Sequence, residues 1–191
     1  MSAVLEHAPA ALGPIPVIET GRLRLRPHKM GDADALAQSL ADFQITRMLA
    51  RVPLPYDRQD AIDWLNSIVG KAGSDWYLAI TDESDVHLGT ISVELRHGRF
   101  HLGYWLNRSF WGRGYMTEAV SAVVERFLRR MPGARLHSGV FADNGASLRV
   151  QEKLGFVVTG TSEVFSVARN AMVSHIDTEV DEARFRRWPT R

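Results

Sequence analysis

The chain has 191 residues, of which 45% are hydrophobic and 24% are charged, as in an ordinary globular domain. It contains no cysteine, which excludes a disulfide scaffold, a thiolate metal site and a cysteine nucleophile. Its 23 basic and 22 acidic residues leave a net charge of +1, so the balance gives no support for nucleic-acid binding by phosphate neutralisation. No apolar stretch approaches the roughly 20 residues that a membrane span needs.

The first residues are rich in alanine and proline and have no basic segment ahead of their apolar residues, so they make a poor signal peptide. We expect residues 1–17 to be a flexible or loosely packed lead-in and residues 18–191 to form one domain. No internal repeat or low-complexity tract interrupts that domain. The expected location is the cytoplasm.

The N-terminal part predicts one strand followed by two helices. Residues 22–26 alternate charged and apolar side chains, as a half-buried strand does, and Pro27 is expected to stop this strand. Asp32 is placed to cap a helix whose apolar positions are Leu36, Ala37 and Leu40. Asp57 is placed to cap a second helix, with a buried side made of Ala61, Ile62, Leu65, Ile68 and Val69.

The middle of the chain predicts three strands and a long helix. Residues 76–81, 87–95 and 99–106 have the composition of strands, and the short link at 96–98 makes the last two an antiparallel hairpin. An amphipathic helix follows over about residues 116–130, with arginines at its negative end.

The C-terminal part predicts a strand at 135–141, a short helix at 144–154 that Gly155 ends, and strands at 156–158 and 172–180. Taken together, the elements predict an α+β or mixed α/β fold with one central sheet.

The segment from Asn107 to Ala119 joins a strand end to the start of the long helix. Backbone amides at a helix start are unpaired and attract anions. Gly112 and Gly114 would let the main chain approach a phosphate, and Arg113 would add charge. The alternative is a tight turn that only caps the helix. A dinucleotide fingerprint would need a third glycine where Thr117 stands, and no P-loop is present.

A second candidate segment runs from Asp143 to Phe156. Asn144 opens a helix and Ser147 lies on its first turn. In a sheet with two successive β–α units, both helix starts lie at the carboxyl ends of their strands, where ligands collect. We therefore expect Asn144 and Ser147 to face the same crevice as the glycine loop. The alternative is an N-cap followed by an ordinary serine.

Five motifs together resemble those of the GNAT superfamily of N-acetyltransferases, in its RimJ/RimL-like branch. They are RLRLRP at Arg22, GYWL at Gly103, WGRGYMTEA at Trp111, N-x-x-S at Asn144 and EKLGF at Glu152. Each alone is weak, but their joint order and spacing are specific. The resemblance implies a single GNAT-like domain with a central, mostly antiparallel, splayed sheet flanked by helices, and acetyl-CoA as co-substrate. No His, Asp or Glu cluster has metal-ligand spacing, so no metal is expected.

The resemblance also assigns roles to residues. The family's pyrophosphate loop, [QR]-x-x-G-x-[GA], falls on residues 111–116, where Trp111 replaces Gln or Arg and Met116 replaces a small residue. A strand segment would bind the pantetheine arm, Asn144 would contact the cofactor arm, and Ser147 would lie near the thiol. The full set expected to bind the cofactor is Tyr104, Trp105, Leu106, Trp111, Gly112, Arg113, Gly114, Tyr115, Met116, Thr117, Asn144, Ser147, Lys153 and Phe156.

Acetyl transfer from a thioester to an amine needs a donor for the tetrahedral oxyanion and a proton for the leaving thiolate. Without cysteine no thioester-linked enzyme intermediate can form, so we expect direct attack in a ternary complex. A backbone amide within residues 104–106 is the expected oxyanion donor, and Ser147 is the expected acid, directly or through water. Glu94 and His101 are candidate bases because they lie on polar faces of the hairpin, and a water relay is equally consistent.

The sequence therefore predicts an acetyl-CoA-dependent N-acetyltransferase whose acceptor is a protein N-terminus or a small amine. The acceptor pocket is expected to come from the first two helices and from late loops, around residues 42–56 and 160–171. Two other functions stay open, a non-catalytic acyl-CoA-binding module and a nucleotide-binding module. The expected partners are acetyl-CoA and an amine, without nucleic acid or membrane, and the resemblance implies that a homodimer can form.

Overall fold

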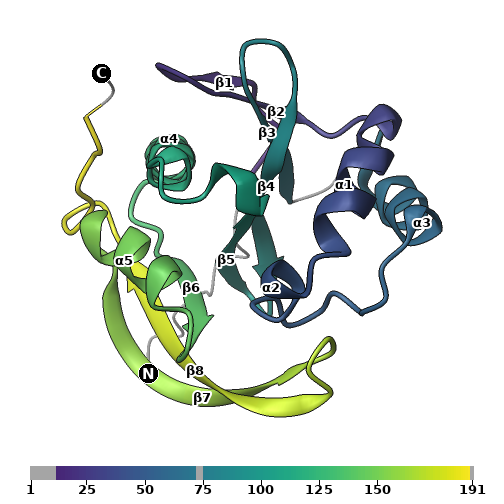
Figure 1. Ribbon diagram of the computed structural model, residues 1–191. Coiled ribbons are helices and arrows are strands. Elements are labelled where there is room, and N and C mark those ends of the chain that lie inside the picture. The colour runs from purple at the N-terminus through teal and green to yellow at the C-terminus, as the bar shows by residue number, and fades with distance from the viewer. Residues whose placement is uncertain (1–11, 72–74, 190–191) are drawn as a thin grey trace, which may run out of the picture.

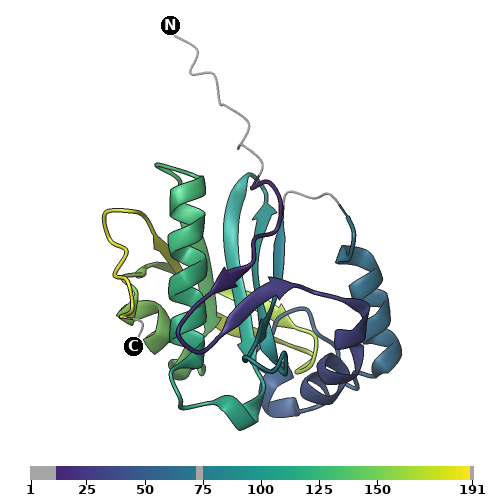
Figure 2. The same cartoon turned by 90° about the horizontal axis from the view of Figure 1, so that it is seen from above.

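One sheet organises the molecule (Figures 1 and 2). The computed structural model describes residues 12–71 and 75–189. Eight strands follow the spatial order β1-β2-β3-β4-β5-β6-β8-β7. Their bounds are β1 Ile18–Glu19, β2 Arg24–Pro27, β3 Trp76–Thr81, β4 His87–Arg96, β5 Arg99–Leu106, β6 Leu136–Phe141, β7 Val157–Ser166 and β8 Ala171–Val180.

The sheet opens between β5 and β6. These strands are parallel, and their register joins only Phe100 to Leu136 and His101 to His137. Every other neighbouring pair is antiparallel. Since β5 continues to Leu106, its last residues have no partner strand on the β6 side in the described chain. The expected mixed α/β fold with a mostly antiparallel, splayed sheet is confirmed.

Helices cover both faces of this sheet (Figure 1). On one side lie α4 (Tyr115–Arg130) and α5 (Gly145–Lys153), and on the other lie α1 (Ala33–Leu40) and α3 (Arg58–Ile68). The predicted apolar stripe of α4 is buried in the main core, together with β3, β4 and β5. Burial of each such side chain contributes roughly 1.5–3 kcal/mol, so this packing fixes the start of α4 beside the open end of β5.

Several local predictions are confirmed. The side chain of Asp57 caps α3 by accepting the amides of Gln59 and Asp60. His97 and Gly98 form the tight turn of the β4–β5 hairpin with φ angles of 49° and 75°. Gly155 follows α5 with a φ of 88°, as a residue that ends a helix in the left-handed region does.

Other local predictions need correction. The strand predicted at 22–26 is present as β2, but it begins two residues later, at Arg24, and Pro27 is its last residue. Asp32 makes no side-chain cap for α1, because its buried carboxylate pairs with Arg26 at 2.8 Å instead. The strand predicted at 156–158 extends to Ser166, so most of the loop expected at 160–171 is strand. Four short elements were not predicted: β1, α2 (Phe43–Thr46) and the 3-10 turns η1 (Met30–Asp32) and η2 (Arg108–Phe110).

Part of the segment expected to be a lead-in packs against the domain. Residues 1–11 lie outside the described residues. Leu12, however, is buried in the main core, and its carbonyl accepts Nε of Arg130 at 3.1 Å. The carbonyl of Gly13 accepts Nε1 of Trp76 at 3.3 Å. Residues 12 and 13 are therefore part of the packed domain.

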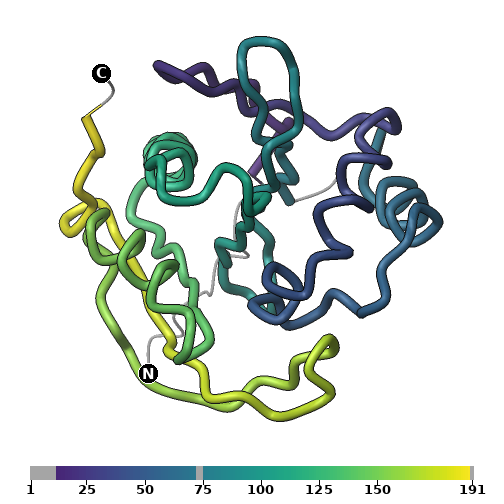
Figure 3. The backbone as a smooth tube through the Cα atoms, in the orientation of Figure 1, coloured from purple at the N-terminus to yellow at the C-terminus, as the bar shows by residue number. Residues whose placement is uncertain are grey.

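The tip of the β7–β8 hairpin packs against the segment after α2, far away in sequence (Figure 3). The amide of Val167 donates to the carbonyl of Ala50 at 3.0 Å, and Nε of Arg169 donates to the carbonyl of Arg47 at 2.6 Å. Arg169 also donates to both carboxylate oxygens of Asp143, which lies in the turn between β6 and α5. The hairpin thus joins the N-terminal helices to the β6–α5 turn. No helix in the described ranges combines the length and apolar character that a bilayer crossing requires.

Candidate active site

The loop between β5 and α4 presents free backbone amides. Gly112 and Gly114 adopt φ angles of 75° and 78°, a region that other residues enter only with strain. The first i to i−4 bond of α4 runs from the amide of Glu118 to the carbonyl of Gly114, at 3.1 Å. The amides just before it have no intrahelical partner of that kind. Within the described chain, no other group accepts a hydrogen bond from the backbone amides of Gly112 and Gly114. The loop has the unpaired donors that a diphosphate needs.

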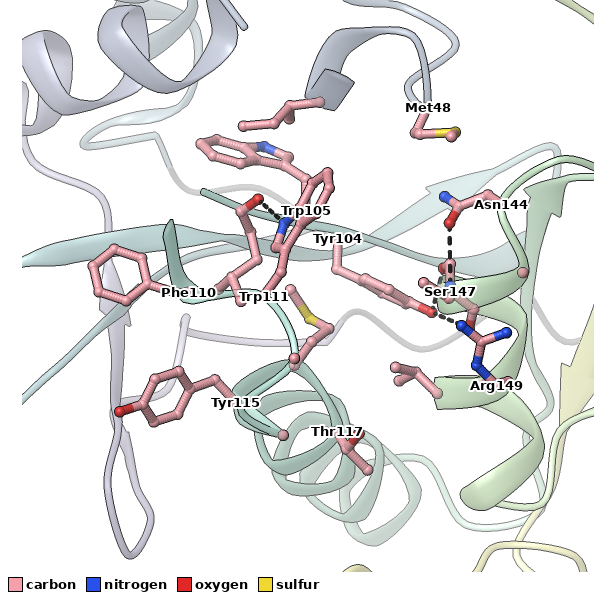
Figure 4. A pocket seen from close by; sticks show the side chains of 18 of the residues that line it. Met48, Tyr104, Trp105, Phe110, Trp111, Tyr115, Thr117, Asn144, Ser147 and Arg149 are labelled. Atoms are coloured by element: carbon pink, nitrogen blue, oxygen red, sulfur yellow. Dashed lines mark hydrogen bonds between the residues drawn. The ribbon is translucent and has the colours of Figure 1, made fainter. Parts of the chain in front are cut away.

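A cavity of about 430 Å³ lies beside this loop and continues along the open end of β5 (Figure 4). Its walls come from β5, the glycine loop, α5 and the α2 segment. The expected cofactor residues among them are Tyr104, Trp105, Leu106, Trp111, Gly112, Gly114, Tyr115, Met116, Thr117, Asn144, Ser147 and Lys153.

Two expected cofactor residues do not line this cavity. Phe156 is buried in the main core, where the residue is only 6% exposed. Arg113 is exposed, and its guanidinium lies 6.0 Å from the ring centroid of Phe110. Trp111 is fixed at the cavity edge, because its Nε1 donates to the carbonyl of Leu106 at 2.7 Å.

Ser147 and Tyr104 meet where β5 faces the start of α5 (Figure 4). Oγ of Ser147 donates to the phenol oxygen of Tyr104 at 2.8 Å, and that phenol donates to the carbonyl of Ser147 at 3.2 Å. Burial raises the pKa of Tyr104 to about 12, so the phenol stays protonated near neutral pH. Asn144 uses its side-chain oxygen to cap α5 through the amide of Ser147, at 3.1 Å. The two predicted residues of α5 are therefore brought together at the cavity.

A second cavity, of about 700 Å³, lies on the other side of β5. Both candidate bases, Glu94 and His101, line it, and they face each other in the β4–β5 register. Residues 48–53 and Tyr56 also line it, as expected of an acceptor pocket, whereas of the range 160–171 only Val164 does. The two cavities share six lining residues, which are Met48, Leu49, Tyr104, Trp105, Asn144 and Ser147.

The two candidate bases differ in environment. Glu94 is buried and accepts hydrogen bonds from Arg51, Arg96 and Ser92, which hold the pKa of its carboxyl below the usual range despite burial. His101 has no such partner among the described residues, and burial, with Arg96 and His137 nearby, lowers its pKa to about 4. Both groups are therefore unprotonated at neutral pH, and Glu94 has its oxygens occupied.

Sequence reasoning placed residues 42–56 at the acceptor pocket and missed that α2 and the residues after it also line the first cavity. Gln44, Ile45, Met48 and Leu49 line the first cavity, although a helix of four residues has no periodic signal to find it by. It also missed Arg96, which lines the second cavity, and it assigned no role to Arg51, although Arg51 lies within the range expected at the acceptor pocket. In the described residues, no group of three His, Cys, Asp or Glu side chains comes together as a metal site would require.

Comparison with known proteins identifies the family. The family model described as Acetyltransferase (GNAT) domain matches residues 22–157. "Uncharacterized N-acetyltransferase p20" of Bacillus licheniformis is 26% identical over 159 residues, 81% of this chain and 89% of that protein. "L-amino acid N-acetyltransferase AaaT" of Escherichia coli is 24% identical over 152 residues, 78% of this chain and 91% of its own.

A solved structure shares the fold. The crystal structure of a GNAT-family acetyltransferase from Bacillus anthracis aligns with a TM-score of 0.77 at 19% identity, over 88% of this chain and 99% of that one. The free amides of the glycine loop, and the cavity that leads from them to β5, fit a thioester that carries a diphosphate and an extended arm. The chain therefore belongs to the GNAT acetyltransferase family, and it is an N-acetyltransferase that uses acetyl-CoA.

Proposed function

We propose that this chain transfers an acetyl group to a primary amine by direct attack in a ternary complex, and that it belongs to the RimJ/RimL-like branch of its family. One observation carries the proposal: the two cavities meet at Tyr104, Trp105 and Ser147. A thioester in the first cavity and an amine in the second would face each other there. Holding two reactants in this way is worth up to roughly 7–11 kcal/mol of the barrier. The branch assignment is supported by the five motifs.

The backbone of β5 supplies the proposed oxyanion donor. The carbonyl of Leu102 accepts Oγ of Ser138 on β6, and the carbonyl of Leu106 accepts Trp111, so both peptide groups face away from β4. Alternation along a strand turns the peptide group of Tyr104 to the same side. No strand pairs with β5 there in the described chain. The amide of Tyr104 is therefore free to donate to a developing oxyanion.

Ser147 is the proposed proton donor to the leaving thiolate. Its hydroxyl lies 2.8 Å from the phenol oxygen of Tyr104, which stays protonated and can return a proton to it. For the base we propose water or His101, since Glu94 already accepts three partners on its two oxygens. A histidine with a depressed pKa is neutral at pH 7 and can hold a water against the incoming amine.

The acceptor we propose is a small amine. The second cavity is bounded by the segment after α2 and by residues of β7 and β8, and the hairpin tip is fastened to that segment through Arg169. A cavity bounded by these elements suits a small molecule better than a folded protein N-terminus. The name of the relative AaaT, which refers to L-amino acids, is in keeping with this choice.

The test is release of free CoA from acetyl-CoA in the presence of a panel of primary amines, including small amines and N-terminal peptides. We expect release with small amines and intersecting lines in double-reciprocal plots, as a ternary complex requires. Parallel lines would contradict direct attack. Thermal stabilisation by CoA without thiol release from any amine would identify a non-catalytic binding module. Protection by ATP or NAD but not by CoA would identify a nucleotide-binding module.

A further inference from the structure

A buried carboxylate holds two arginines at the wall of the second cavity. Nη2 of Arg51 lies 2.9 Å from both oxygens of Glu94. Arg96 approaches the same carboxylate with Nη2 at 2.7 Å and Nε at 3.1 Å. Oγ of Ser92 adds a third donor at 2.9 Å. With both oxygens occupied, Glu94 orients the two guanidinium groups and has little capacity left for a ligand.

Both arginines keep donors for a ligand. A guanidinium has five N–H groups, and the described residues offer neither Arg51 nor Arg96 a hydrogen-bond acceptor other than Glu94. The side chains are 67% and 37% exposed, so these donors reach the cavity. Two positive charges against one negative charge leave this cluster with an excess of one positive charge. His101 is neutral at pH 7 and leaves that excess unchanged.

The other carboxylates that line the cavity have partners of their own. Asp60 accepts the amide of Asp57 in the cap of α3, at 2.9 Å. Asp177 accepts Oγ of Ser162 at 3.2 Å and lies 2.9 Å from Nδ1 of His175. Neither is paired with Arg51 or Arg96 in the described structure. The arginine pair is therefore a distinct positive feature of the cavity wall.

We propose that Arg51 and Arg96 bind a carboxylate of the acceptor, so that the acceptor is an amino acid or short peptide with a free carboxyl group. This inference rests on the proposed function. Planar guanidinium groups match a carboxylate with paired hydrogen bonds. In the β4–β5 hairpin, the cluster lies at the level of His101, three residues from Tyr104, or about 10 Å along the strand. An acceptor can thus place its amine near Tyr104 while its carboxylate reaches the arginines.

The experiment compares matched acceptors. An amino acid, a dipeptide and a tripeptide are each assayed beside the corresponding C-terminal amide, with CoA release as the readout. For at least one acceptor, we expect kcat/KM to be at least about tenfold higher with the free carboxylate than with the C-terminal amide. The length of the acceptor with the largest difference then reports the span from Tyr104 to the arginines. Equal or higher kcat/KM for all amides would overturn the inference while leaving acetyl transfer intact.

Variants assign the effect to the arginines. In Arg51→Gln we expect a loss of about tenfold in kcat/KM for the carboxylate acceptor and little change for its amide. Arg58→Gln is the control, since Arg58 is similarly exposed and paired with Asp34 but does not line the cavity. A loss that is equal for both acceptors, or equal in the control, would overturn the inference. Arg51→Gln leaves Arg96 and Ser92 on Glu94, so the fold is expected to persist.

A binding measurement separates this inference from the proposed function. Calorimetry with CoA-saturated protein compares an N-acetyl amino acid with its amide, neither of which has a reactive amine. Preference for the free carboxylate, lost in Arg51→Gln, would support the arginine site even if no amine were acetylated. If the protein acetylates amines but shows no preference for the free carboxylate, the arginine site is rejected and the proposed acetyl transfer stands.

Discussion

Arg22 and Glu118 form a salt bridge between the turn that precedes β2 and the first turn of α4. Nε and Nη2 of Arg22 lie 2.8 Å and 2.6 Å from the same carboxylate oxygen, and the amide of Arg22 donates to the other oxygen at 3.0 Å. Nη1 of Arg22 donates to the carbonyl of Arg113 at 3.0 Å, and the guanidinium lies 4.5 Å from the ring centroid of Tyr115. One side chain thus contacts residues on both sides of Gly114. We infer that the pair holds the glycine loop in its amide-presenting conformation.

The first prediction concerns this pair. In Glu118→Gln, Arg22 loses its charged partner, so the loop is expected to loosen and CoA affinity to fall about tenfold, with about 1–3 kcal/mol lost from the free energy of unfolding. Calorimetric titration with CoA and urea unfolding measure the two effects. Glu125→Gln, two turns further along the same helix, where Glu125 pairs with Arg129 and Arg187 instead of with Arg22, is the control and should change neither appreciably. Unchanged CoA affinity in Glu118→Gln would mean that the pair only joins β2 to α4.

The second prediction tests the glycine loop itself. Gly114→Trp should abolish thermal stabilisation by CoA, because a large side chain would occupy the space in front of the free amides. At a ligand concentration of about 100 times Kd, that stabilisation amounts to roughly 2.7 kcal/mol in the native protein. Gly133→Trp is a matched control, since Gly133 also has a φ of 78° but does not line the cavity. If Gly114→Trp keeps its response to CoA, the cofactor binds elsewhere.

The third prediction concerns proton transfer. Ser147→Ala removes the hydroxyl that lies between the cavity and Tyr104, so kcat should fall about tenfold to a hundredfold while CoA affinity changes little. Tyr104→Phe should lower kcat as well, and the double variant should lose less than the product of the two losses, because the residues act as a unit. Steady-state kinetics and CoA titration measure both quantities. An unaltered kcat in Ser147→Ala would remove this residue from the chemistry.

Periodicity and turn chemistry predict the long elements of this fold well. The stripe of α4, the cap of α3 by Asp57 and the β4–β5 hairpin all depend on interactions within a few residues of each other. The short elements β1 and α2 escape such reasoning, because two or four residues carry no period. β1 forms by pairing with β2, and α2 is held by its Asp42 cap and by Ile45, which packs in the cluster of α1 and α3.

The residues of the candidate site also fall into those that local sequence patterns predict and those that depend on distant contacts. The glycine loop and the start of α5 can be predicted because each is a strand–turn–helix unit with its own motif. Glu118 is a different case, since its partner Arg22 is 96 residues away and no spacing rule connects them. Strand alternation places Glu94 on a polar face, but it cannot show that Arg51, from a loop 43 residues earlier, occupies the carboxylate. The pairing of Glu94 with Arg51, which is distant in sequence, makes Glu94 a positioning residue and not a base.

The fourth prediction is acid sensitivity from buried histidines. His87 is 8% exposed, and neither ring nitrogen has a hydrogen-bond partner among the described residues. Burial, with His28 beside it at 5.6 Å between ring centroids, lowers the pKa of His87 from 6.5 to about 4. The pKa of His28 is lowered too, mainly by burial. The unfolded chain therefore binds more protons than the folded one once the pH falls below about 6.5.

The free energy of unfolding should accordingly be unaffected by His87 above about pH 6.5. It should fall as the pH drops toward 4, by up to about 3 kcal/mol for a pKa shift of this size. Urea unfolding at pH 7, 5.5 and 4.5 measures the decline, in the native protein and in His87→Leu. The variant removes one titrating ring without breaking a hydrogen bond, so its unfolding free energy should vary less steeply with pH. His97→Leu, in the exposed hairpin turn, is the control and should keep the native slope. If the unfolding free energy of His87→Leu also varies with pH as steeply as that of the native protein, protonation of other groups causes the acid sensitivity.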